Sequence, residues 1–352
     1  MPPRDTDRYD ITLKGYSGGQ APQLSLYSAH LKAQDSGQDD DNRRLAETTA
    51  IRNDAQTLGH AFIVGGDFNV QSSNDIGYAK LIGSQTDNGG RFFDPMNRST
   101  NVTWENRAEY SYLHTQDPTG SGGMDSRFDF LLTNGSLVDG KGFDYVGNAA
   151  KAYTPDAGST WNDSAHSYTV WGNDGTSFNA TLKTTGNTEV GEGIAQALKN
   201  AATTAGGHLP VFLDLRAPGQ IVTSTSLLDF GTVTVGQTAV AGLDVFDSVD
   251  TSILGDDVAS ILYSFSATSG FSAPTGTFSD ALGGGVNGHL FTFNGASAAG
   301  VYSGLLTILS SDPDVLGRTV AFRVNVQAVP EPSAFVALGL GALAFLRRRR
   351  KA

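Results

Sequence analysis

Histidine, aspartate and asparagine side chains follow apolar runs at four places along this chain of 352 residues. The four motifs are SAHLK at 28–32, GDFN at 66–69, RFD at 127–129 and GHLP at 207–210, and they contain His30, Asp67, Asn69, Asp129 and His208. Carboxylate and amide oxygens suit Mg²⁺, and imidazoles gain and lose protons near neutral pH. These residue types therefore predict chemistry on a phosphate group or at a divalent metal ion.

Strands must position these side chains, because each motif lies at the end of a short apolar run. We predict strands at 23–31, 61–64, 128–132 and 209–215. A polar loop is expected at 34–42, followed by a helix at 43–58 with a ragged apolar stripe. Residues 71–123 are expected to form loops with short elements, where binding specificity commonly resides.

Each candidate residue also has a structural interpretation. Asp67 follows two glycines and would project from a tight turn with Asn69 on the same side, or the two could simply cap the next segment. His30 could be a buried core histidine. The segments 114–116 (HTQ) and 173–175 (NDG) are candidates for the rim of a site, with ordinary loop structure as the alternative.

In this order, the four motifs resemble the endonuclease/exonuclease/phosphatase superfamily, whose fold is that of deoxyribonuclease I. The resemblance implies an α+β four-layer α/β/β/α sandwich over residues 1–216 and metal-dependent phosphoester hydrolysis with Mg²⁺ or Mn²⁺. It implies that Asp67 acts on the attacking water near the metal and that Asn69 contacts a phosphoryl oxygen and the metal. His30 would contact the phosphate, and Asp129 and His208 would form a dyad. Arg127 is itself expected to be a structural ion-pair partner rather than a catalytic group.

Two departures from the family pattern leave the activity open. At its final histidine the family has Ser-Asp-His, whereas here Gly206 and Gly207 precede His208, so a metal-site aspartate is missing. The family also begins with strands that carry an Asn and a metal-binding Glu, but only a polar tail with Asp5, Asp7 and Asp10 precedes the strand of His30. We therefore expect the opening strands, and a secretory signal peptide, to be missing from this sequence.

Beyond residue 216 the sequence pattern changes to short β-rich runs separated by turns. These runs lie at 221–226, 231–235, 261–267, 289–293, 304–309 and 320–326. Many short strands at such spacing predict a β-sandwich, and the segment 217–328 resembles immunoglobulin-like modules of bacterial surface proteins. A spacer or adhesion module is the expected role.

The last segment, 329–352, combines Val329-Pro330-Glu331-Pro332, an apolar run at 333–346 and a basic end. It resembles the PEP-CTERM sorting signal of Gram-negative bacteria that produce exopolysaccharide, and it is expected to form a C-terminal apolar helix. The run is short for a permanent single-pass anchor. The resemblance implies export, a precursor tethered to the inner membrane, processing by an exosortase, and release to the cell surface or the exopolysaccharide matrix.

Composition limits the function further. The chain has no cysteine, which excludes disulfide partners and cysteine nucleophiles, and its net charge of −12 argues against binding nucleic acid for its own sake. Two interpretations remain besides a chance set of motifs. The first is an exported phosphoester hydrolase, nuclease-like or phosphatase-like, whose substrates could include nucleic acid. The second is a catalytically degenerate binding or matrix protein that keeps the fold.

Overall fold

The computed structural model describes residues 4–33, 36–86, 88–96, 103–120, 122–154, 163–205 and 207–329. The fold is mixed α+β with mostly strands and few helices. The chain forms two compact units. The first unit extends to Gln220 and includes Val249–Ser260 and Asp312–Val315, and the second consists of Ile221–Ser248, Ile261–Ser311 and the residues from Leu316 onward.

A five-stranded sheet organises the first unit, in the order β1–β2–β3–β5–β4. Its strands are β1 (Thr6–Thr12), β2 (Gln23–His30), β3 (Ala61–Asp67), β5 (Asp129–Asn134) and β4 (Phe92–Phe93). Strand β2 pairs in parallel with β3, whereas β1 with β2, β3 with β5 and β4 with β5 are antiparallel. The strands predicted at 23–31, 61–64 and 128–132 are confirmed, within a few residues at their ends.

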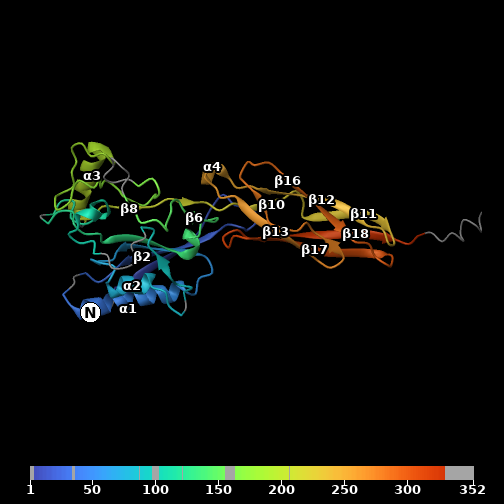
Figure 1. The fold of residues 1–352 in the computed structure, drawn as a ribbon, viewed down its shortest axis with the longest axis horizontal. Helices are drawn as coiled ribbons and strands as arrows, with labels where there is room; N and C mark the ends of the chain where they lie inside the picture. Colours follow the sequence, from blue (N-terminus) through green and yellow to red (C-terminus); the bar gives the residue numbers. More distant parts are fainter. Residues whose placement is uncertain are drawn as a thin grey trace, which may run out of the picture. The chain divides into compact units, whose positions relative to one another are not determined.

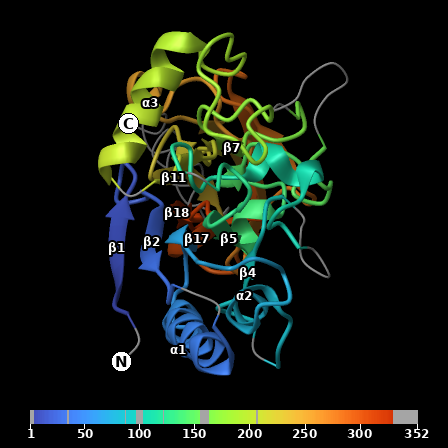
Figure 2. The same cartoon turned by 90° about the vertical axis from the view of Figure 1, so that its left-hand side faces the viewer.

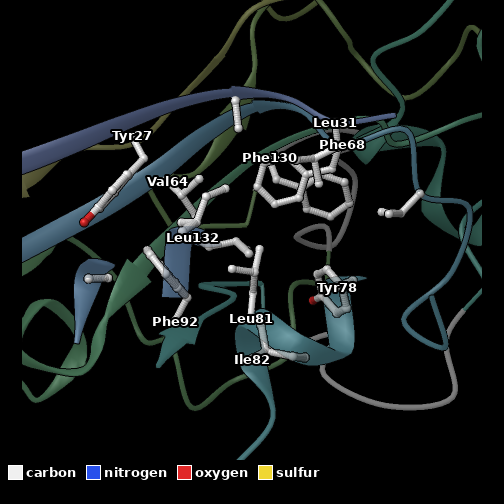
Figure 3. Close-up of a cluster of buried hydrophobic side chains, with 14 of the residues drawn as sticks. Tyr27, Leu31, Val64, Phe68, Tyr78, Leu81, Ile82, Phe92, Phe130 and Leu132 are labelled. Carbon is white, nitrogen blue, oxygen red and sulfur yellow. The ribbon is translucent and has the colours of Figure 1, made fainter. Parts of the chain in front are cut away.

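Two helices cover one face of this sheet. Helix α1 (Gln38–Ala55) and helix α2 (Ile76–Ile82) lie side by side in both ribbon views (Figures 1 and 2). The core between them and the sheet contains Val64 and Phe130 from the strands and Tyr78 from α2, all at most 1% exposed (Figure 3). Side chains alternate along a strand, so Ala61, Ile63 and Leu24 pack on the opposite face. The central strands β2 and β3 are therefore covered on both faces.

The remaining elements of the first unit are short except for one helix. They include the 3₁₀ helices η1 (Ala108–Leu113) and η2 (Gly135–Val138), strands β6 (Asp144–Tyr145) and β7 (Thr169–Val170), and helices α3 (Gly191–Ala205) and α4 (Thr251–Leu254). Residues 71–123 contain α2, β4 and η1 among loops, as the sequence predicted. Sequence reasoning did not identify α3.

Three local predictions for the first unit are wrong. Helix α1 begins at Gln38 inside the predicted loop 34–42, because Asp39, Asp40 and Asp41 lie in its first turn, where the helix dipole favours negative charge. The predicted polar tail contains strand β1, an edge strand with six of its seven residues exposed. The predicted strand 209–215 is two short strands, β8 (Val211–Phe212) and β9 (Leu215–Arg216), which pair with β7 and β6 respectively.

The second unit is built from two sheets. A four-stranded sheet has the order β10 (Ile221–Thr223), β12 (Ala239–Asp247), β16 (Asn287–Phe293) and β14 (Phe271–Ser272). A five-stranded sheet has the order β11 (Leu227–Thr234), β18 (Arg318–Gln327), β17 (Gly300–Ser310), β13 (Ile261–Ala267) and β15 (Phe278–Asp280). Ring contacts join the two sheets, such as Phe291 to Phe322 with centroids 5.9 Å apart. The six strands predicted here are confirmed, and β12, β14 and β15 are additional.

The C-terminal segment from residue 330 lies outside the described residues, and so does the predicted apolar helix. Among the described residues, no helix is long and apolar enough to cross a membrane.

Candidate functional site

Strand register brings three of the predicted residues together. His30 is the partner of Asp67 across the parallel β2–β3 pair, and Asp67 is the partner of Asp129 across the antiparallel β3–β5 pair. Directly paired residues project from the same face of a sheet. By the alternation along each strand, this is the face opposite α1 and α2. His30, Asp67 and Asp129, which are 37 and 62 positions apart in the sequence, thus form one row across the ends of three neighbouring strands.

The end of β3 is fixed by glycine and by backbone hydrogen bonds. Gly66 has a φ of 137°, and a Cβ there would lie 1.9 Å from the carbonyl oxygen of Ala29. Leu31 donates its N–H to the Asp67 carbonyl at 2.8 Å, and Phe68 donates its N–H to the Phe128 carbonyl at 2.7 Å. The backbone at Asp67 is therefore held by both neighbouring strands.

The Asp67 carboxylate faces His30 on one side and the next turn on the other. Its Oδ1 accepts the N–H of Asn69 at 2.9 Å, and its Oδ2 lies 3.4 Å from Nε2 of His30. Burial, followed by the negative charge of Asp129, raises the pKa of Asp67, although His208 and the Asn69 N–H act in the opposite direction. Asn69 adopts a left-handed φ of 52°, and its Nδ2 donates to the Leu31 carbonyl at 3.1 Å.

Asp129 and His208 form a short hydrogen-bonded pair. The Nδ1–H of His208 donates to Oδ2 of Asp129 at 2.7 Å, and the side chains are 24% and 20% exposed. Burial disfavours the charged imidazole, but the hydrogen bond and the negative charge of Asp129 outweigh it, so that the pKa of His208 is raised. The pair therefore favours a protonated imidazole that remains accessible to solvent.

Gly207 lies beside this pair in a conformation that favours glycine. Its φ is 85°, and a Cβ at this position would lie 3.6 Å from Oδ1 of Asp117. Asp117 donates its N–H to the Gly207 carbonyl at 2.7 Å. The Asp117 carboxylate accepts no hydrogen bond within the described residues, and its negative charge contributes to the raised pKa of His208. Residue 207 therefore has no carboxylate of its own, but the Asp117 carboxylate lies close to the dyad.

Arg127 is buried behind the site rather than exposed within it. Its guanidinium forms two contacts with Asp94, at 2.8 and 3.0 Å, and both side chains are 0% exposed. Its Cζ lies 4.2 Å from the ring centroid of Phe130. The prediction that Arg127 is a structural ion-pair partner is confirmed.

The alternatives left open for other residues are now decided. The His30 side chain is 62% exposed, so it is not a core histidine. His114 and Thr115 are 0% exposed, and Asn173 and Asp174 are at most 1% exposed, so these residues belong to the interior and not to an accessible rim. Sequence reasoning missed the hydrogen bonds of Thr115 with Asp129 and Leu209 and that of Asp117 with Gly207, because they depend on pairing between loops that no periodic pattern indicates.

The donor atoms at the site are hard oxygens. Asp67 and Asp129 are direct cross-strand partners, and like charges in such positions repel each other. A Mg²⁺ ion bound through one or two carboxylates and the phosphate of a substrate would relieve this repulsion, so the donor set fits such an ion. No group of three or more His, Asp or Glu side chains in the described part of the chain could hold a metal by itself.

Comparison with known families finds a sorting motif at the C-terminus. Residues 328–351 match the family described as the PEP-CTERM protein-sorting motif. This motif indicates an exported, surface-targeted protein and implies processing by an exosortase. No curated protein matches the chain in sequence.

Similarities to solved structures are weak. An endonuclease/exonuclease/phosphatase from Beutenbergia cavernae is 14% identical, with 89% of this chain and 67% of that chain covered and a TM-score of 0.24. A family 123 glycoside hydrolase from Clostridium perfringens is 7% identical, with 30% of this chain and 24% of that chain covered and a TM-score of 0.25. This chain thus spans about a quarter of that hydrolase. At these TM-scores, neither similarity carries an argument about fold or function.

Proposed function

We propose that this protein is an exported phosphoester hydrolase of the endonuclease/exonuclease/phosphatase superfamily that depends on Mg²⁺ or Mn²⁺. One observation carries the proposal: His30, Asp67 and Asp129 lie in register on three neighbouring strands, and His208 joins them through a hydrogen bond of 2.7 Å to Asp129. Two accessible imidazoles, each beside a carboxylate, are well suited to proton transfer at a phosphate.

We assign each residue a role that its contacts support. Asp67 lies beside His30 across the β2–β3 pair and accepts a proton from the water that attacks phosphorus. His208 in its charged form donates a proton to the departing oxygen as the phosphorus–oxygen bond breaks, and Asp129 supports that charge. His30 and the second N–H of the Asn69 amide contact the phosphoryl oxygens.

A divalent ion would be held by Asp67 and by the side-chain oxygen of Asn69. When bound, such an ion supplies charge neutralisation for the phosphoryl oxygens. The net charge of −12 makes this contribution important, because the protein as a whole repels a phosphate.

We also propose a division of the chain into two domains and a sorting segment. Residues 1–216 form the four-layer α/β/β/α domain that carries the site, and 217–328 form an immunoglobulin-like spacer or adhesion module. Residues 329–352 hold the precursor in the inner membrane of a Gram-negative bacterium until an exosortase releases the protein to the surface or matrix. The substrate is a phosphoester, with nucleic acid as one candidate.

The test is hydrolysis of bis(p-nitrophenyl) phosphate with Mg²⁺, with Mn²⁺ and with EDTA. Asp67→Asn and His208→Ala are expected to lower kcat by about 10²–10⁴-fold. His60→Ala is the matched control, since His60 contacts the Ser25 hydroxyl at 2.8 Å and lies outside the site. Turnover that survives His208→Ala, or that EDTA leaves unchanged, would contradict the proposal.

One observation favours an alternative, in which the protein binds a matrix component and has no turnover. Gly207 occupies the position where the superfamily pattern has a metal-site aspartate, and its left-handed φ of 85° disfavours an aspartate. Absence of hydrolysis with both metals, together with retention of the folded chain on exopolysaccharide, would support this second function.

A further inference from the structure

The segment from His114 to Asp117 connects the two halves of the Asp129–His208 pair. Thr115 donates its N–H to the Ser126 carbonyl at 2.9 Å, and its own carbonyl accepts the N–H of Leu209 at 2.8 Å. Gln116 forms an antiparallel bridge with His208. The segment is therefore hydrogen-bonded to the chain before Asp129 on one side and to the chain around His208 on the other.

The Thr115 hydroxyl holds the backbone at Asp129. Its Oγ1 accepts the N–H groups of Phe128 and Asp129, each at 3.2 Å, and the residue is 0% exposed. Backbone N–H groups removed from water need a partner. A buried β-branched side chain also has few rotamers to adopt. The hydroxyl is therefore a fixed acceptor that sets the position of the Asp129 backbone.

We propose that Thr115 is the positioning residue of the Asp129–His208 pair. Its hydroxyl holds Asp129 and its carbonyl holds Leu209, the neighbour of His208, so one rigid residue fixes both partners of a hydrogen bond of 2.7 Å. The pair itself joins residues 79 positions apart in the sequence. The consequence for turnover rests on the proposed function, whereas the consequence for the hydrogen bond does not.

Loss of the hydroxyl has a defined effect. Without Oγ1, the N–H groups of Phe128 and Asp129 lose their acceptor, and the Asp129 backbone can shift relative to His208. Catalytic groups need to be held within about 0.5 Å of their productive positions. A small shift at Asp129 is therefore expected to weaken the hydrogen bond to His208 and to lower kcat, with little change in KM.

Substitutions at Thr115 can separate the hydroxyl from the rest of the side chain. Thr115→Val keeps the shape and removes the hydroxyl, whereas Thr115→Ser keeps the hydroxyl. The matched control is Thr133→Val on β5, because Thr133 is also 0% exposed but its hydroxyl has no hydrogen-bond partner within the described residues. If Thr115→Val does not fold, Thr115→Ala replaces it, and its comparison with Thr115→Ser isolates the hydroxyl.

The first readout is the low-field proton NMR signal of the His208 Nδ1–H, assigned by its loss in His208→Gln. We expect the signal in the parent chain, in Thr115→Ser and in Thr133→Val, and its loss or upfield shift in Thr115→Val. An unchanged signal in Thr115→Val would overturn the proposal. This measurement needs no turnover, so it decides the role of Thr115 even if the chain hydrolyses nothing.

The second readout is turnover of bis(p-nitrophenyl) phosphate with Mg²⁺. We expect Thr115→Val to lower kcat by roughly 10–100-fold with KM nearly unchanged, and Thr115→Ser to restore it. A Thr115→Val variant with the parent kcat would overturn the positioning role. Absence of turnover in the parent chain would instead contradict the proposed function.

Discussion

The buried ion pair of Arg127 and Asp94 makes a sharp prediction about stability. Asp94→Asn preserves the shape of the side chain and removes its charge. Asp94 accepts two hydrogen bonds from Arg127, one from the Tyr78 hydroxyl at 2.8 Å and one from the Met96 N–H at 3.0 Å. The substitution would leave the Arg127 guanidinium 0% exposed and without a counter-charge.

The expected loss of unfolding free energy follows from the burial of this ion pair. Removal of one partner from a buried ion pair typically costs about 3–5 kcal/mol, since an uncompensated charge stays in the interior. With a denaturant slope of about 2 kcal/mol per molar urea, the midpoint of unfolding should fall by roughly 1.5–2.5 M. The cation–π contact with Phe130 remains and offsets only a small part of the loss.

Tryptophan fluorescence in urea is a suitable assay. The three tryptophans, at positions 104, 161 and 171, precede the second unit in the sequence, so their emission reports on the first unit. Arg8→Gln is the control, because Arg8 and Asp54 form an ion pair at 2.6 Å with side chains 33% and 48% exposed. Such a pair contributes at most about 1 kcal/mol. If Asp94→Asn shifts the midpoint no further than the control, the structural role assigned to Arg127 is refuted.

Three more predictions concern two backbone positions and a half-buried acid. Gly66→Ala should destabilise the first unit by about 2–6 kcal/mol in urea titrations, because its Cβ would overlap the Ala29 carbonyl at 1.9 Å. Gly207→Asp should cost about 1–2 kcal/mol from its left-handed φ and add repulsion from Asp117, without raising turnover of bis(p-nitrophenyl) phosphate. Burial, with a further contribution from a nearby negative charge, raises the pKa of Glu189 to about 7. Its contribution is present below pH 4.5 and lost as the pH rises through about 7, so the urea midpoint should fall less between pH 5 and pH 8 in Glu189→Gln than in the parent chain.

The sequence predicted the central strands because their burial leaves a simple signature. The run Ala61–Val64 is apolar throughout, since α1 and α2 cover one of its faces and the segment around Leu137 covers the other. The two glycines after it mark the turn at Asp67. The candidate residues at the strand ends could therefore be named from the sequence, and the strand register brings His30, Asp67 and Asp129 together.

The errors have equally physical causes. Strand β1 is polar because it is an exposed edge strand, so it lacks the apolar run that identifies an interior strand. The start of α1 was predicted too late in the sequence, because three consecutive aspartates suggest a loop. At the N-terminus of a helix, however, they stabilise the first turn. The predicted strand 209–215 failed because β8 and β9 pair with different partners, which a pattern confined to seven residues cannot reveal.

The candidate site contains residues that the sequence pattern can place and a residue that it cannot. Three of its residues are placed by strand register, which depends on burial patterns that can be read in the sequence. His208 instead belongs to a loop segment, and its place beside Asp129 depends on the bridge to Gln116 and on the Thr115 hydrogen bonds. Motifs can identify such a histidine, but the residues that position it lie in segments without periodicity. If the site has turnover, changes in those segments should alter kcat while the strand-borne residues remain in place.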